Sequence, residues 1–320
     1  MDFVFVARNV SKGAFGNNPG QSRFLAVPET AEDAIPGHNV TRKSWFERVI
    51  YEAETGRSPT GDVLGDVLIY IHGFNNSTRD MLTRLRLIRR GLEANGFRGV
   101  VVAFDWPSAD TALAYLTDRE KALDTARRLV LDAILPFVGY NQPNCRISLH
   151  VLAHSMGAFV LREAFDRADY HAAASAKGWT ISQMMILSGD VSANSMGTSP
   201  ESDSLYRHCV RLTNYSNPLD SILSLSEIKR AGISPRVGRV GLPPDAPSNA
   251  VNVDVGPYFS AVRDRLPGIT NPDHCFYFYD PLLLRDVALT VRGAIDRASI
   301  PTRRLMTGRL VLHPEQPDQP

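Results

Sequence analysis

The sequence predicts an α/β fold in which a mostly parallel central sheet carries helices on both faces. Short apolar runs rich in β-branched residues, such as residues 63–71 and 99–104, are typical of strands buried on both faces of a parallel sheet. Segments with apolar residues at helical spacing, such as residues 81–92, separate these runs. Regular alternation of strands and helices favours a parallel sheet over an antiparallel one.

The N-terminal segment is predicted to supply a strand pair and a helix. Residues 3–6 form a first predicted strand, and residues 23–27 form a second strand that can pair with it. Residues 13–20 between them are predicted to be rich in turns because they contain glycine, asparagine and proline. Thr41 is the predicted N-cap of a helix that ends near Ala53.

The alternation then continues to the end of the chain. The strand over residues 63–71 ends at His72-Gly73, Ser77 caps the helix over residues 81–92, and Gly96 closes that helix. The remaining predicted strands are 99–104, 146–152, 184–187, 210–215 and 251–255, and the remaining predicted helices are 118–135, 158–165 and 280–298.

No linker divides the chain, so residues 1–305 are predicted to form a single domain. Residues 232–248 are rich in proline and glycine and are predicted to be a surface excursion near the cleft. Residues 306–320 carry three prolines among polar residues and are predicted to be a flexible tail. The oligomeric state is left open.

Composition excludes several classes of function. The formal net charge is +1 with 22% charged residues, which argues against nucleic acid or an anionic membrane surface as a partner. One local basic run lies at helical spacing among apolar residues, and we expect it to be the solvated face of a helix. Its members are Arg84, Arg86, Arg89 and Arg90.

The sequence contains no pattern that predicts a metal, an organic cofactor or a membrane span. Cys145, Cys209 and Cys275 are few and widely spaced, which favours a reducing compartment over a disulfide framework. The N-terminus lacks a signal-peptide pattern, and no apolar run approaches 18 residues. The expected location is therefore the cytoplasm.

Ser155 is the predicted nucleophile. It lies in AHSMG (153–157), where small residues two before and two after a serine suit a tight turn between a strand and a helix. The motif alone is weak, because ANSMG (193–197) matches it equally well. Ser155 follows an apolar strand and precedes a helical segment, whereas Ser195 lies among loop residues. This context favours Ser155.

A second motif lies about 80 residues earlier, at His72-Gly73-Phe74. A tetrahedral intermediate carries negative charge on the former carbonyl oxygen and needs preorganised donors. The backbone N–H groups of Phe74 and Met156 are the predicted oxyanion-hole donors. His72 itself is interpreted as structural, because the base of such a site comes last in the chain.

His274 is the predicted base. Two histidines follow a plausible acid, His274 and His313, and His313 lies in the predicted tail. His274 follows the last predicted strand and precedes the last predicted helix, so its loop can reach the carboxyl edge of the sheet. Asp220 is favoured as the acid that orients the imidazole, and Asp190 remains the alternative acid.

Four segments together resemble a bacterial α/β-hydrolase family known as domain of unknown function 900, an esterase/lipase-like group. They are VLIYIHGFNN (67–76), FDWPS (104–108), AHSMG (153–157) and HCFY (274–277). The resemblance spans roughly residues 60–295 and implies an α/β-hydrolase fold and a serine hydrolase with these roles. NPLDSIL (217–223) is similar to the family's acid-bearing turn, which supports Asp220.

The sequence departs from the family at Asp105, where serine is usual before Trp106. An additional carboxylate near the cleft is expected to raise the pKa of the histidine or to disfavour acidic substrates. Asn75 and Trp106 are candidate substrate-binding residues. Trp106 follows a strand and is equally compatible with core packing.

These features predict a serine hydrolase that cleaves small-molecule carboxylic esters through an acyl-enzyme, with Ser155, Asp220 and His274 as a triad. The same residues suit amide or thioester hydrolysis and acyl transfer, which differ in the leaving group and in the access of water. A non-catalytic binding module on the same fold is the alternative from another class.

Overall fold

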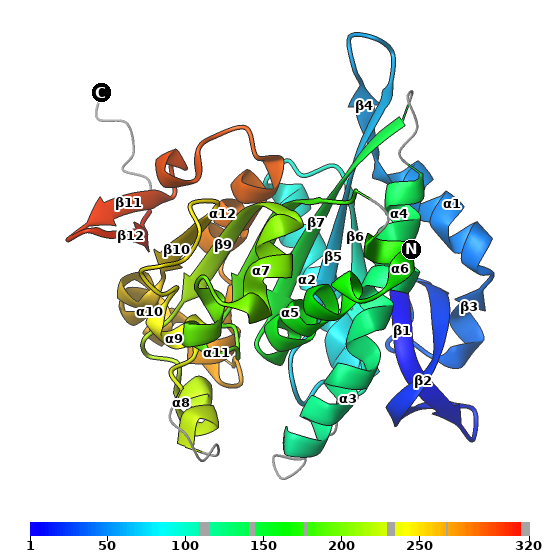
Figure 1. Ribbon diagram of the computed structural model, residues 1–320, viewed down its shortest axis with the longest axis horizontal. Coiled ribbons are helices and arrows are strands. Elements are labelled where there is room, and N and C mark those ends of the chain that lie inside the picture. Colours follow the sequence, from blue (N-terminus) through cyan, green and yellow to red (C-terminus); the bar gives the residue numbers. More distant parts are fainter. Residues whose placement is uncertain (109–114, 141–144, 176–177, 229–233, 267, 315–320) are drawn as a thin grey trace.

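The computed structural model describes residues 1–108, 115–140, 145–175, 178–228, 234–266 and 268–314. Among these residues, twelve strands form one sheet in the order β11-β12-β10-β9-β8-β7-β5-β6-β1-β2-β3, with β4 paired to β5 (Figure 1). The strands are β1 (Asp2–Ser11), β2 (Ala14–Val27), β3 (Asn39–Val40), β4 (Glu54–Arg57), β5 (Val63–Ile71), β6 (Val100–Asp105), β7 (Cys145–His154), β8 (Ile181–Leu187), β9 (Cys209–Ser216), β10 (Ala250–Asp254), β11 (Arg303–Met306) and β12 (Arg309–Leu312).

The centre of the sheet is parallel, which confirms the predicted fold class. Every pairing from β1 through β6, β5, β7, β8, β9 and β10 to β12 is parallel. The antiparallel pairings described are β1–β2, β2–β3 and β11–β12 at the two edges and β4–β5 at the amino end of β5. Parallel central strands align their carboxyl ends, so the loops that follow them meet at one edge.

Helices cover both faces, and each face has its own apolar core. In Figure 1, α3, α5 and α7 lie in front of the sheet, and α2 and α12 lie behind it. Trp45, Phe137 and Phe165 belong to one core, and Leu85 and Val287 belong to the other. The helices are α1 (Arg42–Ala53), α2 (Thr78–Ala94), α3 (Tyr115–Arg128), α4 (Leu135–Gly139), α5 (Met156–Asp169), α6 (Ala172–Ser175), α7 (Pro200–Arg207), α8 (Ser221–Ile228), α9 (Val237–Val240), α10 (Gly256–Val262), α11 (Pro272–Cys275) and α12 (Pro281–Arg292).

The predicted N-caps of α1 and α2 are confirmed. Thr41 Oγ1 accepts a hydrogen bond from Ser44 N at 3.2 Å. Ser77 forms a capping box, because its hydroxyl accepts from Asp80 N at 3.1 Å while Asp80 Oδ2 accepts from Ser77 N at 3.1 Å. These local contacts satisfy backbone donors that the first helical turn leaves without partners, which explains why sequence alone located both starts.

The N-terminal hairpin is longer than predicted. Residues 13–20 were expected to form turns, yet most of them extend β2, and the turn is confined to Lys12 and Gly13. Irregularities in the pairing on both sides of Arg8 accommodate Pro19, which lies opposite Arg8. A bulged hairpin arm at the sheet edge tolerates a proline that a central strand would not.

The helix predicted over residues 118–135 begins earlier and continues further. After α3, a π-helical segment spans Leu129–Ile134 and leads into α4. Leu135 N donates to Val130 O, five residues back, directly before Pro136. Proline has no N–H and crowds the preceding turn, and a wider π turn is one way in which a helix absorbs it.

The closing helix is shorter than the predicted span of residues 280–298. α12 ends at Arg292 because Gly293 adopts a left-handed conformation with φ 62°. The residues beyond it form a separate 3₁₀ turn, Arg297–Ser299. Gly293 therefore ends α12, and the end of the apolar pattern in the sequence does not.

The prediction of a surface excursion over residues 232–248 is wrong for residues 236–238, whereas Pro244, Asp245 and Ser248 are exposed. Arg236 and Val237 are buried rather than exposed. Gly238 packs closely against Ser188, the residue after β8. A Cβ on Gly238 would lie 2.2 Å from the carbonyl carbon of Ser188. This segment therefore supports the loop after β8 from inside the protein.

The predicted flexible tail does not begin at Met306. The chain continues into β12, which lies between β10 and the edge strand β11. Leu310 and Val311 of β12 pair in parallel with Val253 and Asp254 of β10. The edge of β10 presents unpaired backbone groups, and an apolar segment that pairs with it satisfies them. Residues 315–320 of the predicted tail lie outside the described residues.

A buried ion pair ties this C-terminal edge to α12. Asp286 and Arg303 both have side chains with no exposed surface, and Arg303 Nη2 donates to Asp286 Oδ1 at 2.6 Å. Tyr215 of β9 also donates its hydroxyl to Asp286 Oδ1 at 2.6 Å. One carboxylate thus joins α12, β9 and β11.

We expect Asp286→Asn to lower the free energy of unfolding by about 3 kcal/mol, because it leaves Arg303 buried without a carboxylate. Urea unfolding followed by circular dichroism measures the difference. Asp264→Asn is the control, since Asp264 is 93% exposed, and it should change stability by less than about 0.5 kcal/mol. Equal unfolding free energies for the two variants would show that the ion pair does not stabilise this edge.

Candidate active site

Ser155 lies on the tight turn that joins β7 to α5, as the sequence predicted. Its backbone has φ 54° and ψ −125°, a strained conformation for a residue with a side chain. Ser155 N donates to Leu187 O at 3.0 Å, and Asp190 N donates to Ser155 O at 2.9 Å. These bonds to the end of β8 and the loop after it hold the strained turn in place.

Two glycines allow the backbone beside Ser155 to approach it. A Cβ on Gly157 would lie 2.5 Å from Ile71 O, and a Cβ on Gly73 would lie 2.8 Å from Ser155 Cβ. The loop after β5 and the turn after β7 are therefore in direct contact. Phe74 follows one glycine, and Met156 precedes the other, so the two predicted oxyanion-hole donors belong to touching segments.

His274 and Asp220 form a buried hydrogen bond. His274 lies on α11, and its Nδ1 is 2.7 Å from Asp220 Oδ2. Because an ionised carboxylate can only accept, Nδ1 carries the proton and Nε2 is left as the acceptor. The two residues are 54 positions apart in sequence, and the fold brings them together.

The carboxylate of Asp220 is fixed by two further donors. Ser188 Oγ donates to Asp220 Oδ2 at 2.6 Å, and Leu223 N donates to Oδ1 at 2.9 Å. Asp220 has no exposed surface. Three donors on one buried carboxylate leave it little freedom to rotate, so the imidazole of His274 is also held in one orientation.

Asp190, the alternative acid, belongs to a different pair. Arg236 Nε lies 3.1 Å from Asp190 Oδ1, and both side chains are buried. The described hydrogen bond from His274 goes to Asp220 instead. Asp190 still lines the same cavity as Ser155, so its place in sequence correctly predicted its neighbourhood.

A cavity of about 450 Å³ opens at Ser155 and His274. Its wall combines apolar side chains from α8 with polar ones from α2 and from the loop before α11. The lining residues are Phe74, Asn75, Asp80, Arg84, His154, Ser155, Asp190, Ile222, Leu223, Leu225, Thr270, Asn271, His274 and Cys275. Figure 1 shows α8 and α11 at the same, lower edge of the sheet, where loops from several strands meet.

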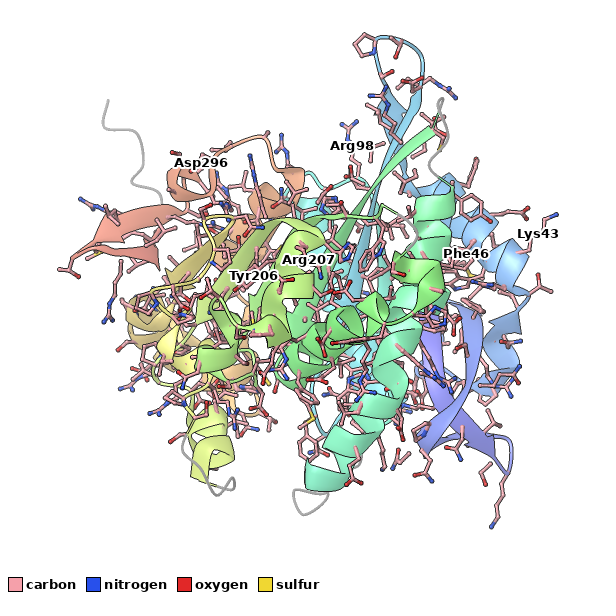
Figure 2. The ribbon with its side chains drawn as sticks, viewed as in Figure 1. Lys43, Phe46, Arg98, Tyr206, Arg207 and Asp296 are labelled. Atoms are coloured by element: carbon pink, nitrogen blue, oxygen red, sulfur yellow. The ribbon has the colours of Figure 1, made fainter. Side chains whose placement is uncertain are left out.

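Another cavity, of about 510 Å³, lies beside α7. Tyr206 and Arg207, which line it, appear on the front of the molecule in Figure 2. Its lining includes serines but no histidine. It therefore lacks the combination of a candidate nucleophile and a candidate base that lines the cavity at Ser155.

A buried charge network holds the loop after β5. Arg8 Nε donates to Asp105 Oδ2 at 2.8 Å, and Arg8 Nη2 donates to Asn76 O at 2.9 Å. His72 Nε2 lies 2.9 Å from Asp105 Oδ1. Burial alone would raise the pKa of Asp105, but the charge of Arg8 and the contact with His72 hold it below its usual value. The carboxylate is therefore ionised and anchors the loop.

This geometry corrects the expectation for Asp105. The carboxylate has no exposed surface, is paired with Arg8, and is not among the residues that line the cavity. It therefore offers no free negative charge to repel an acidic substrate. The interpretation of His72 as structural agrees with its buried contact to Asp105.

Of the two candidate substrate-binding residues, one lines the cavity and the other is buried. Asn75 lines the cavity, is exposed and has φ 55°. Trp106 is fully buried, and its indole Nε1 donates to His72 O at 2.8 Å. Trp106 therefore packs behind the loop and has no surface to offer a substrate in this conformation.

The competing serine and histidine lie elsewhere. Ser195 is on a 3₁₀ turn, where its Oγ accepts from Arg162 Nη1 at 2.7 Å and donates to Ser192 O at 2.9 Å. His313 follows β12, and its backbone N donates to Thr302 O. Neither lines the cavity at Ser155.

Within the described residues, no group of three or more His, Cys, Asp or Glu side chains is arranged to hold a metal ion. The same part of the chain contains no helix long and apolar enough to cross a membrane.

The model of the family described as alpha/beta hydrolase of unknown function (DUF900) matches residues 57–252, more than half of the chain. The chain belongs to this family. The resemblance inferred from the sequence is thereby confirmed. The first 56 residues, which include the hairpin that carries Arg8, lie outside the matched region.

Among curated proteins the hydrolase has no match. It is similar to several solved structures. A proposed cell surface hydrolase from Lactobacillus plantarum WCFS1 is 14% identical, with a TM-score of 0.37 over 72% of this chain and 90% of the other. A cutinase-like protein from Cryptococcus sp. is 15% identical, with a TM-score of 0.33 over 71% and 92%. At these TM-scores the similarity supports neither an activity nor a substrate.

Sequence reasoning missed several residues around the site of this hydrolase. Arg84 was expected on a solvated helix face, yet it lines the cavity. Ser188, directly after β8, binds Asp220, and Arg8 of β1 binds the loop after β5, and both contacts join residues far apart in sequence. Only His154 could have been found from a local sequence pattern, because it lies inside the motif that contains Ser155.

His154 packs directly against His274, the predicted base. Its Nε2 donates to His274 O at 2.9 Å, and the two ring centroids are 4.7 Å apart. Its Nδ1 has no hydrogen-bond partner among the described residues. Burial, followed by the charges of His274 and Arg84, lowers the pKa of His154 well below its usual value. The ring is therefore neutral and holds α11 through the His274 carbonyl.

We expect this buried neutral histidine to make the hydrolase less stable as the pH falls below about 6.5. There the unfolded His154 binds a proton that the folded one excludes, so unfolding takes up a proton and stability drops by at most about 1.4 kcal/mol per pH unit. His154→Gln keeps a side-chain N–H donor and should show a shallower decline. Urea unfolding between pH 5 and 7.5 tests this.

His171→Gln, at an exposed position, serves as the control, and its free energy of unfolding should depend on pH as that of the wild type does. Parallel pH dependences for wild type and His154→Gln would contradict the assignment of a depressed pKa to His154.

Proposed function

We propose that this hydrolase cleaves carboxylic esters through an acyl-enzyme formed on Ser155. The observation that carries the proposal is the 2.7 Å hydrogen bond between His274 and Asp220 at the wall of the cavity that Ser155 lines. A serine on a strained turn, a histidine with an acceptor nitrogen and a fixed carboxylate are the groups that acyl transfer requires.

In the proposed reaction, Ser155 Oγ attacks the ester carbonyl carbon while His274 Nε2 takes the hydroxyl proton. The carbonyl oxygen becomes an oxyanion that accepts from the N–H groups of Phe74 and Met156. The C–O bond to the alcohol then breaks, and the protonated His274 gives its proton to the leaving alcohol. Asp220 stabilises the imidazolium and remains ionised throughout.

A water molecule completes the cycle. His274 Nε2 takes a proton from the water while the water oxygen attacks the acyl carbon. The bond between the acyl carbon and Ser155 Oγ then breaks, and His274 gives the proton back to Ser155 Oγ. The products are a carboxylic acid and the free enzyme. The apolar side chains of Ile222, Leu223 and Leu225 at the cavity wall are compatible with an uncharged acyl chain.

Ser155→Ala should lower kcat for p-nitrophenyl acetate and butyrate by about 10⁴-fold or more, because no nucleophile remains. A fluorophosphonate probe should label Ser155 of the wild type, as located by mass spectrometry, and should not label the variant. Ser195→Ala is the control and should keep wild-type rates.

Absence of both hydrolysis and labelling in the folded wild type would favour a non-catalytic binding module. Hydrolysis alone does not separate an esterase from an acyltransferase that uses the same residues. Competition between water and an added alcohol for the acyl-enzyme distinguishes the two activities, and matched amide and thioester substrates separate the remaining alternatives.

The two candidate acids make opposite predictions for kcat. Asp220→Asn should lower kcat by about 10⁴-fold, because the amide donates to His274 and favours the wrong tautomer. Asp190→Asn should lose far less in kcat while it weakens the buried pair with Arg236 and lowers the melting temperature. Steady-state kinetics on variants shown to be folded checks both. A larger kcat loss for Asp190→Asn would make Asp190 the acid.

A further inference from the structure

Arg84 is a half-buried cation in the wall of the candidate active site. It lies on the second turn of α2 and lines the same cavity as Ser155 and His274. Its Nη2 lies 3.7 Å from Cys275 Sγ, and its guanidinium carbon lies 5.1 Å from the ring centroid of Phe278. The guanidinium is therefore held against the segment that carries the base.

The partners of Arg84 are neutral. Burial raises the pKa of the Cys275 thiol, although the charge of Arg84 opposes this effect. Burial likewise raises the pKa of Tyr70, the other group with which Arg84 interacts. Both remain protonated at neutral pH, and no carboxylate among the described residues forms an ion pair with Arg84 within 4.0 Å. A guanidinium has five donors, so several remain for a ligand.

Other arginines of α2 either pair with a carboxylate or are exposed to solvent. Arg86 Nε is 2.9 Å from a carboxylate oxygen of Asp2, and Arg89 Nη1 is 3.0 Å from the other. Arg90 is exposed to solvent. Arg84 thus differs from its neighbours, since it is partly withdrawn from water and forms no ion pair within 4.0 Å with any carboxylate that the structure describes, an arrangement that a bound anion would compensate.

The two acids that line the cavity do not neutralise Arg84. Asp190 is already paired with Arg236. Asp80 is exposed, and its carboxylate accepts two hydrogen bonds from Ser77 at the N-terminus of α2. Its charge acts on Arg84 from a distance and helps to raise the pKa of the guanidinium, but solvent and the helix dipole weaken this effect.

We propose that Arg84 binds an anionic group, a carboxylate or a phosphate, on the alcohol part of the ester substrate. The planar guanidinium matches both groups with paired hydrogen bonds. The alcohol side follows from position: His274 gives its proton to the leaving alcohol, and Arg84 contacts Cys275, the next residue. This inference rests on the proposed function and names its substrate class.

The test compares aryl acetates that differ in the group on the leaving phenol. 4-Acetoxybenzoate and 4-acetoxyphenyl phosphate carry an anion, and 4-acetoxybenzamide is the neutral match for the first. p-Nitrophenyl hemisuccinate carries its carboxylate on the acyl side instead. Each is assayed with wild type, Arg84→Gln, Arg84→Lys and the exposed control Arg90→Gln.

Arg84→Gln should lower kcat/KM for at least one anionic acetate by about tenfold or more, chiefly through KM. The same variant should change kcat/KM for 4-acetoxybenzamide by less than about threefold. Arg84→Lys should recover part of the loss, because it keeps the charge but not the fork of donors. Arg90→Gln should behave as wild type. The anion with the larger loss identifies the preferred group.

A measurement on the wild type covers the case in which Arg84→Gln does not fold. 4-Hydroxybenzoate or 4-hydroxyphenyl phosphate, whichever carries the preferred anion, should inhibit the wild type at lower concentration than 4-hydroxybenzamide. Three results would each overturn this inference. The first is equal inhibition of the wild type by the charged and neutral phenols. The others are an Arg84→Gln loss of kcat/KM that is equal for charged and neutral acetates, or one confined to p-nitrophenyl hemisuccinate. Those results would leave the proposed function standing, whereas a wild type that hydrolyses no ester and takes no fluorophosphonate label would overturn the proposed function itself.

Discussion

Two backbone segments approach each other so closely beside Ser155 that each needs a glycine where it meets the other. β5 and β7 are neighbours with Ile71 opposite Ala153, so the loops that follow them leave the sheet at the same level. Gly73 and Gly157 are the residues at which a Cβ would collide with the opposite segment. This contact places Gly73, and therefore the neighbouring Phe74, beside the turn that carries Ser155, and the oxyanion hole that we propose depends on it.

Buried charges then hold these loops from behind. The pair of Arg8 and Asp105 anchors the loop after β5, and the pair of Asp190 and Arg236 anchors the loop after β8. Burying a charge is unfavourable unless a partner compensates it, so each pair fixes its loop in one arrangement. No carboxylate in the described part of the chain forms such a pair with Arg84, and for that reason we assign Arg84 to a ligand rather than to the scaffold.

Local patterns predicted the elements well, and long-range pairing explains where they failed. Residues 63–71 were predicted as a strand with the same bounds as β5, and the caps at Thr41 and Ser77 were located, because hydrophobic runs and caps are local signals. The segment after Met306 was mistaken for a tail because its strand exists only through pairing with β10. Likewise, Arg84 lies at helical spacing like its neighbours, and only packing against α11 shows that it lines the cavity.

The sequence by itself determined the fold class, the turn that carries Ser155 and the family, since each depends on residues close together in the chain. It also narrowed the base to His274 and the acid to two aspartates. Only the tertiary structure decided which aspartate contacts the histidine, because Asp190 and Asp220 both follow strands at the same edge. The difference arises from partners distant in sequence: Arg236 pairs with Asp190, and Ser188 and His274 bind Asp220.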